Sequence, residues 1–315
     1  MQKLSRLVRL LLAKKNRRWI AVAVLVVTFL LVVHFFVVNP QYLERLRSVP
    51  PTVIILVVLI NIPAMAALAW AYKEIVSLCG KNIDVKENML LTAYSSIINF
   101  FGPLQSGPGV RAVYLKARHK IRVRDYALAT LIYYAFFATY CMLFLLVGTR
   151  PWWQTVLGLA AVAGFSLVVI RWFASRGTRT RASDDVPQFH LRRRALVMLG
   201  IAVFIQMVCI AGYYYVELRA VNPGTSVGQA ISYTGAANFS LFVSITPDAV
   251  GFREAFLVFS QQLHHVSTAD IVNANIIDRG AYLLYLGLLF VAMLSIHARD
   301  RLKLRALRRA DAKSE

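Results

Sequence analysis

The chain alternates between long apolar runs and short polar connections. Six of the runs have the length of about 20 residues that an α-helix needs to cross the hydrocarbon core of a bilayer. Two further stretches, 89–110 and 227–250, carry no charged residue except Asp248 in the second, and both contain glycine, proline and asparagine. The pattern predicts an all-α polytopic membrane protein with two broken segments. The predicted spans lie at about 19–38, 52–72, 126–147, 152–170, 195–216 and 276–297.

The first broken segment is the clearest irregular feature of the chain. It reads NFFGPLQSGPGVRAVYLKARHKIRVR over residues 99–124, with breaks at Gly102-Pro103 and Gly107-Pro108-Gly109. Backbone that leaves the helix inside a membrane satisfies its polar groups only against protein or a water-filled cavity. We therefore expect the segment to enter the membrane and return on the same side.

The charge distribution supports this topology. The chain carries 36 Lys and Arg and a net charge of +21, in short blocks between the apolar runs. Such blocks are typical of membrane loops, and nucleic acid is not an expected partner. In the arrangement with six spans and two re-entrant hairpins, both termini are cytoplasmic. The cytoplasmic side then holds 30 of the cations and the outer side holds 6. The alternative of eight full spans gives 19 and 17. The positive-inside rule favours the first arrangement.

The domain organisation follows from the same pattern. We expect a basic cytoplasmic segment at 1–18, a transmembrane domain at 19–298 and a basic cytoplasmic tail at 299–315. The three cysteines are scattered, without the spacing of a metal or redox site. His264 and His265 are adjacent and so do not share a helix face. We expect no metal and no cofactor.

The two broken segments are similar to each other and are predicted to enter from opposite faces of the membrane. The matching residues are Asn99 and Asn238, Pro103 and Pro247, and the Gly-x-Arg triplets that begin at Gly109 and Gly251. Inverted repeats of this kind occur in transporters, whose broken helices meet near the midplane and form the substrate site.

The Gly-x-Arg triplets predict an anion site. A helix that restarts after Gly109 presents free N–H groups, which bind phosphate. Arg111 is expected in the first turn of that helix and Arg253 opposite it, each with a forked donor that matches a phosphate. The alternative is that both arginines lie at the interface and extend to lipid headgroups. The acids Glu254, Asp248 and Asp278 would release the arginines or take protons.

The predicted substrate-binding set joins these residues to their polar neighbours, and no catalytic residue is assigned. Asp278 and Arg279 are expected to pair with the second hairpin or to act as a proton-sensitive gate. The full set is Asn99, Pro103, Gln105, Ser106, Gly107, Gly109, Arg111, Tyr114, Asn238, Pro247, Asp248, Gly251, Arg253, Glu254, Asp278 and Arg279.

The segments NFFGPLQSGPGVRAVYLK and ITPDAVGFREA, followed by Asp278-Arg279 near the last span, resemble the lysylphosphatidylglycerol synthetase transmembrane family over residues 50–298. The resemblance implies a flippase-like unit in the bacterial cytoplasmic membrane that moves a modified lipid between leaflets. Multidomain members carry a synthase domain. None precedes Glu315, so aminoacyl transfer is not expected. Members often have P-G-G-x-G-x-R-E, and this chain departs from that pattern at Asp248-Ala249.

The leading hypothesis is therefore a transporter of an anionic lipid with alternating access through the two hairpins. No ATP-binding loop is present in the sequence, so a gradient or lipid consumption would drive it. One alternative is an intramembrane enzyme acting on lipid-linked phosphate or glycosyl substrates, with Asp248, Glu254 and His264 or His265 as acid–base groups. Another is a non-catalytic partner of a separate lipid-modifying enzyme.

Single cysteines test the topology. Lys116→Cys and Arg176→Cys, each in a chain without native cysteines, should react with a membrane-impermeant thiol reagent only after the cells are permeabilised. The reason is that both positions lie in cytoplasmic blocks when there are six spans. Labelling of both positions from outside intact cells would contradict that topology.

Overall fold

The computed structural model describes residues 49–101, 106–147, 192–242 and 251–314, with a few single residues between these ranges and side chains up to Ile296. The part from Val49 onward forms one compact unit. Some predicted features lie outside the described residues. These are the spans at 19–38 and 152–170, and the site residues Pro103, Gln105, Pro247 and Asp248.

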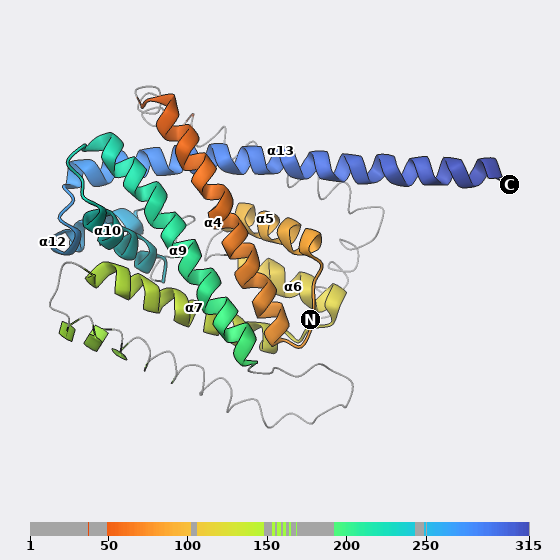
Figure 1. The fold of residues 1–315 in the computed structure, drawn as a ribbon, viewed down its shortest axis with the longest axis horizontal. Helices are drawn as coiled ribbons and strands as arrows, with labels where there is room; N and C mark the ends of the chain where they lie inside the picture. Colours follow the sequence, from red (N-terminus) through yellow and green to blue (C-terminus); the bar gives the residue numbers. More distant parts are fainter. Residues whose placement is uncertain are drawn as a thin grey trace. The chain divides into compact units, whose positions relative to one another are not determined.

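Four long helices dominate the described part of the chain. They are α4 (Pro51–Leu78), α7 (Val123–Leu146), α9 (Arg193–Val221) and α13 (Thr268–Ser314). Each contains a stretch long and apolar enough to cross a membrane, which in α13 is Thr268–Ile296. Helices α4 and α9 pack along each other, and both contact α7 and α13 (Figure 1). The described residues contain no strand, so the predicted all-α polytopic class is confirmed.

The outward faces of these helices are apolar. On α9 the exposed large side chains include Val197, Ile201, Phe204, Ile205 and Val208. Their spacing of three or four residues places them on one face of the helix. An exposed apolar stripe of this length is unfavourable in water and suits contact with lipid. The bundle therefore has the surface of a membrane protein.

The first broken segment is a helical hairpin. It consists of α5 (Val85–Phe101) and α6 (Gly107–His119). Glu87 in the first turn of α5 accepts hydrogen bonds from Tyr114 (2.6 Å) and Arg118 (2.8 Å) near the end of α6, and lies 3.0 Å from His119. A straight helix over the same 32 residues would separate these ends by about 48 Å. The segment therefore folds back on itself, as the sequence predicted.

The polar end of this hairpin is held by charge as well as by hydrogen bonds. Burial raises the pKa of Glu87, but hydrogen bonds from Tyr114 and His119 and the charges of His119 and Arg118 outweigh it and leave the pKa below its ordinary value. A lowered pKa in the folded state means that the carboxylate stabilises the fold above its unfolded-state pKa. This contribution is lost as the pH falls through the lowered pKa.

The second broken segment is also a hairpin. It contains α10 (Val227–Phe239), the short 3₁₀ helix η2 (Ser240–Phe242), α11 (Phe252–Phe259) and α12 (Gln261–His264). Ser226 and Gln229 form a capping box at the start of α10. The Gln229 amide also donates to the carbonyl of His265, 36 residues later, at 3.1 Å. The start and the end of the segment therefore meet.

Two helix starts differ from the sequence prediction. Helix α6 begins at Gly107 and not after Gly109. Pro108 favours this start because the first turn needs no amide N–H partner. Arg111 is consequently in the second turn and not the first. Helix α13 begins at Thr268 instead of residue 276, so Asp278 lies about three turns inside it.

The described chain contains two units of similar construction. In the first, the α5–α6 hairpin lies between α4 and α7 in the sequence. In the second, the α10–α12 hairpin lies between α9 and α13. Each unit is thus a long helix, a hairpin and a long helix. This agrees with the predicted internal repeat, while its opposite orientation across a membrane stays a prediction.

A glycine on α10 provides a test of the packing between the hairpin and α7. A Cβ at Gly235 would lie 2.3 Å from the amide nitrogen of Leu145 and 2.6 Å from the carbonyl oxygen of Cys141. Backbone atoms cannot give way as a side chain can, so Gly235→Ala should cost about 1–3 kcal/mol of stability. Thermal unfolding in detergent measures this cost. The matched control is Gly287→Ala on α13, where nothing lies within 4 Å of the added Cβ. Equal melting temperatures of the two variants would contradict the packing.

Candidate functional site

A cavity of about 1090 Å³ lies where the two hairpins meet the long helices. Ligand sites in proteins typically have roughly 300–1,000 Å³. The first hairpin contributes Ser95 and Asn99 from α5 and the beginning of α6, and the second contributes Asn238 and Arg253. Most of the remaining wall is aromatic and aliphatic. The cavity therefore combines apolar walls with a few polar groups from both hairpins.

The two matching asparagines face this cavity from opposite hairpins. The side-chain oxygen of Asn99 accepts from the N–H of Gly107 at 3.3 Å and so joins α5 to the first residue of α6. The Asn238 side chain donates to the Thr234 carbonyl at 2.9 Å. Both residues line the cavity. The sequence correspondence between them is therefore also a correspondence of position.

The N-terminal end of α6 forms part of the cavity wall. Gly107, Pro108 and Gly109 all line it. A Cβ at Gly107 would lie 2.6 Å from the Ser95 carbonyl, so only glycine permits this close approach to α5, whereas Gly109 has open space around it. The N-terminus of a 13-residue helix carries a partial positive charge and favours an anion.

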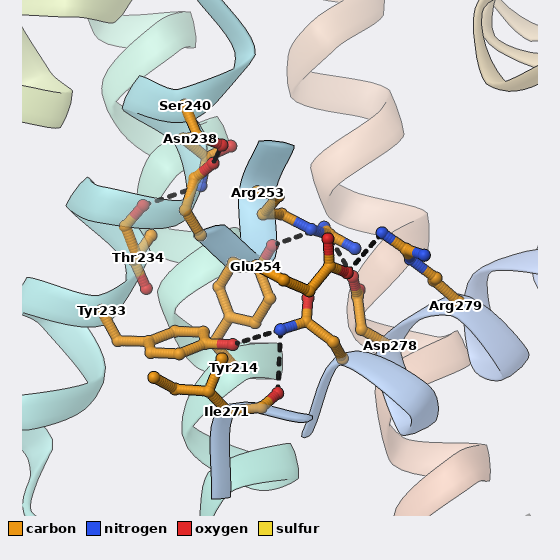
Figure 2. A network of polar contacts seen from close by, with 12 residues as sticks. Tyr214, Tyr233, Thr234, Asn238, Ser240, Arg253, Glu254, Ile271, Asp278 and Arg279 are labelled. Carbon is orange, nitrogen blue, oxygen red and sulfur yellow. Dashed lines mark hydrogen bonds and ion pairs between the residues drawn. The ribbon is translucent and has the colours of Figure 1, made fainter. Parts of the chain in front are cut away.

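Arg253 is the one cation among the described residues that line the cavity. It lies in the first turn of α11, and its Nη1 atom is 2.7 Å from Asp278 Oδ2 on α13, an ion pair drawn in Figure 2. The same nitrogen donates to the Tyr214 hydroxyl on α9 at 3.1 Å. Arg253, Asp278 and Tyr214 all line the cavity, although the arginine and aspartate side chains are only 8% and 10% exposed. Three helices thus hold one ion pair at the edge of the cavity.

A second ion pair secures the same hairpin to α13. Glu254 Oε1 pairs with Arg279, and its Oε2 atom accepts the N–H of Gly251 at 2.8 Å. Gly251 has a φ of 82°, a backbone conformation that favours glycine. The predicted pairing of Asp278 and Arg279 with the second hairpin is therefore present. None of Gly251, Glu254 and Arg279 lines the cavity.

Arg111 is completely buried and lies behind the cavity wall. It donates to Thr92 (3.0 Å) and Asn88 (3.2 Å) on α5. Its guanidinium carbon lies 3.8 Å from the centre of the Tyr72 ring. Tyr72 lines the cavity and Arg111 does not. Among the described residues no carboxylate pairs with Arg111, so its charge rests on neutral groups and an aromatic face.

The prediction that Arg111 is buried is thus confirmed, but its expected position at the helix tip is wrong. The reason is the earlier start of α6, which moves Arg111 from the first turn to the second. Its side chain there lies against α5 and α4 instead of the cavity. Tyr114 is likewise outside the cavity, bound to Glu87, and Ser106 donates to the Ile98 carbonyl at 3.3 Å.

The arginine of each Gly-x-Arg triplet is contacted by a tyrosine of the long helix that precedes its hairpin. Tyr72 of α4 covers Arg111, and Tyr214 of α9 accepts a hydrogen bond from Arg253. The separation along the chain is 39 residues in both cases. This equal spacing can be read from the sequence, but it was not among the matches that predicted the internal repeat. It extends the internal repeat beyond the hairpins.

Sequence reasoning also missed Glu217. It is the only acidic residue of α9 and is fully buried. The predicted span ended at residue 216, which placed Glu217 just outside it, whereas α9 continues to Val221. An acidic residue inside an apolar helix is by default a functional candidate. Glu217 would have been recognised as a candidate if the sequence had shown that the helix continues to Val221.

His264, one of the candidate acid–base groups, is held by contacts with the backbone. His264 is fully buried, its Nε2 lies 2.9 Å from the Leu257 carbonyl, and its Nδ1 accepts the N–H of Val266 at 3.2 Å. Both ring nitrogens are thus engaged by backbone. Within the part of the chain that the structure describes, no group of three or more His, Cys, Asp or Glu side chains could hold a metal ion.

The fold and the cavity define a multi-pass membrane protein with two helical hairpins around a central cavity. Over residues 18–290 the chain matches the family model described as the lysylphosphatidylglycerol synthase TM region, and it belongs to that family. The membership indicates a lipid-related function. No curated protein matches the chain.

The geometry around Arg111 predicts that a lysine cannot replace it. Arg111→Lys removes the fork that joins Asn88 to Thr92 and the flat group over Tyr72. We expect a loss of about 1.5–3 kcal/mol in stability, the value of hydrogen bonds to a charged group. Thermal unfolding in detergent measures it. Arg118→Lys is the control, because that side chain is 62% exposed, and it should change little. If Arg111→Lys were as stable as Arg118→Lys, the forked hydrogen bonds of Arg111 would not contribute to stability.

Proposed function

We propose that this protein moves a lipid with an anionic headgroup between the two leaflets of the bacterial cytoplasmic membrane. The observation that carries the proposal is the cavity at which both hairpins meet, with Arg253 on its wall and the start of α6 beside it. Its volume of about 1090 Å³ has room for a headgroup and part of an acyl chain. Family membership supports a lipid as the substrate.

Arg253 would bind the headgroup phosphate. In the described state its partner is the Asp278 carboxylate, and a phosphate has the same charge sign and a matching geometry for the guanidinium fork. An incoming phosphate therefore competes with Asp278 for the same donor. The N–H groups at the start of α6 would add a second contact. Replacing one anionic partner by another avoids leaving the arginine buried and unpaired.

Arg111 would act differently from Arg253 in this scheme. Because its charge lies behind Tyr72, it makes the potential of the cavity more positive without touching a ligand in the described state. If the two halves open in turn, movement of Tyr72 would bring Arg111 to the cavity as Arg253 is now. The two arginines would then engage the headgroup from opposite sides of the membrane, with both termini in the cytoplasm.

Lipid translocation in reconstituted vesicles tests the proposal. Purified protein should accelerate the movement of fluorescent phosphatidylglycerol between leaflets relative to protein-free vesicles. Arg253→Ala should lower the protein-dependent rate about thirtyfold, because losing a buried charged partner costs about 2 kcal/mol or more. The readout is reduction of the fluorophore by an impermeant reagent.

The matched control is Arg219→Ala, which removes an exposed arginine whose one hydrogen-bond and cation–π partner among the described residues is Tyr215 on the same helix. Its rate should equal that of the unmodified protein. Rates that do not differ between Arg253→Ala and Arg219→Ala would rule out the phosphate-binding role of Arg253. A rate no higher than in protein-free vesicles, for phosphatidylglycerol and for an isoprenoid phosphate probe alike, would overturn lipid transport.

A further inference from the structure

Glu217 is a buried acid for which the proposed lipid path has no use. Its side chain is 0% exposed, and neither carboxylate oxygen has a hydrogen-bond partner among the described residues. It lies four residues before the end of α9, one turn after Tyr214 on the same face of the helix. Tyr214 in turn contacts Arg253, which pairs with Asp278. Glu217 is therefore adjacent to the ion pair of the cavity wall.

Among the residues that the structure describes, the groups around Glu217 leave it without a counter-charge. Arg253 and Asp278 are the charged groups that act on it, and they already neutralise each other. Helix α4 packs along α9 and has no ionisable side chain between Pro51 and Ala71. The other ionisable groups of this region are Tyr213 and Tyr214 on α9, Tyr233 on α10 with His264 beside its ring, and the Glu254–Arg279 pair of α11 and α13.

Electrostatics decides the protonation of such a group. A buried carboxylate without hydrogen bonds or a cation is several kcal/mol less stable than in water, and a proton removes that cost. With a proton on Glu217, the cluster of Arg253, Asp278 and Glu217 has no net charge. Without it, the cluster holds an unsatisfied negative charge.

We propose that Glu217 and Asp278 form a proton-binding site that holds one proton when the cavity is empty and two when an anionic headgroup is bound. The coupling to the headgroup rests on the proposed function, while the proton on Glu217 does not. When the phosphate takes Arg253, the Asp278 carboxylate loses its cation and takes a proton from water, and Glu217 keeps its own. A monoanionic headgroup and a proton therefore enter together, and the charge of the protein with its ligand is unchanged.

The site would couple transport of the lipid to a proton gradient. Since a proton accompanies each anion, a difference in pH across the membrane would drive the lipid toward the side with the lower proton concentration. On that side Asp278 releases its proton, pairs again with Arg253 and displaces the phosphate.

Infrared spectroscopy of the purified protein tests the resident proton. At neutral pH the unmodified protein should show the carbonyl stretch of a protonated carboxyl, and Glu217→Gln should remove it. Glu74→Gln is the matched control, because the partly buried Glu74 accepts a hydrogen bond from Trp70 at 3.2 Å, and the band should persist. If Glu217→Gln does not fold, Glu217→Asp should shift the band. A band that is absent, or unchanged in the Glu217 variants, overturns the proposal.

Proton uptake tests the coupling. Binding of dihexanoyl-phosphatidylglycerol in weak buffer should take up about one proton per bound molecule, and Asp278→Asn should abolish the uptake. Calorimetry in two buffers of different ionisation enthalpy measures it. Binding without uptake overturns the coupling but not lipid transport. Absence of binding overturns both for this lipid, while the infrared band still decides whether Glu217 holds a proton.

Discussion

The structure depends on keeping the guanidinium groups of Arg111 and Arg253 inside an apolar bundle. A charge in such surroundings is costly, about 2.5–3.5 kcal/mol even by insertion measurements. Each hairpin brings its arginine to polar partners that a single straight helix could not supply. Arg111 reaches Asn88 and Thr92 because α6 folds back on α5, and Arg253 reaches Asp278 because α11 lies against α13. The hairpins are thus the means by which the charges are tolerated.

The same constraint is met in different ways in the two halves of the chain. Their helices are arranged alike, but their arginines have different partners. In the first half the partners of the arginine are neutral and the group is sealed behind Tyr72. In the second half the partner is an acid and the pair lies at the cavity. Neutral partners cannot take up the charge of their cation, whereas an acid can exchange its cation for a proton. In the described state the exchangeable ion pair therefore lies in the second half.

Much of the fold followed from periodicity and charge, because long apolar runs and cation blocks are strong signals. Both hairpins were predicted, and so were the burial of Arg111 and the contact of Asp278 and Arg279 with the second hairpin. The ends of the helices were harder to predict from the sequence. Pro108 is compatible with several starts, so α6 was expected to begin three residues too late, and this error misplaced Arg111. The contacts of Tyr72 and Glu217 depend on packing between distant segments, which local pattern does not encode.

The common spacing of 39 residues between tyrosine and arginine has a consequence for the origin of the protein. Two copies of one ancestral unit would each have carried an aromatic residue and a buried cation in the same register. After such a duplication the partners of the cation would have diverged, to neutral groups in one copy and to an acid in the other. A symmetric ancestor would then have acquired two different charge environments without changing its architecture, through the partners of a single side chain in each half.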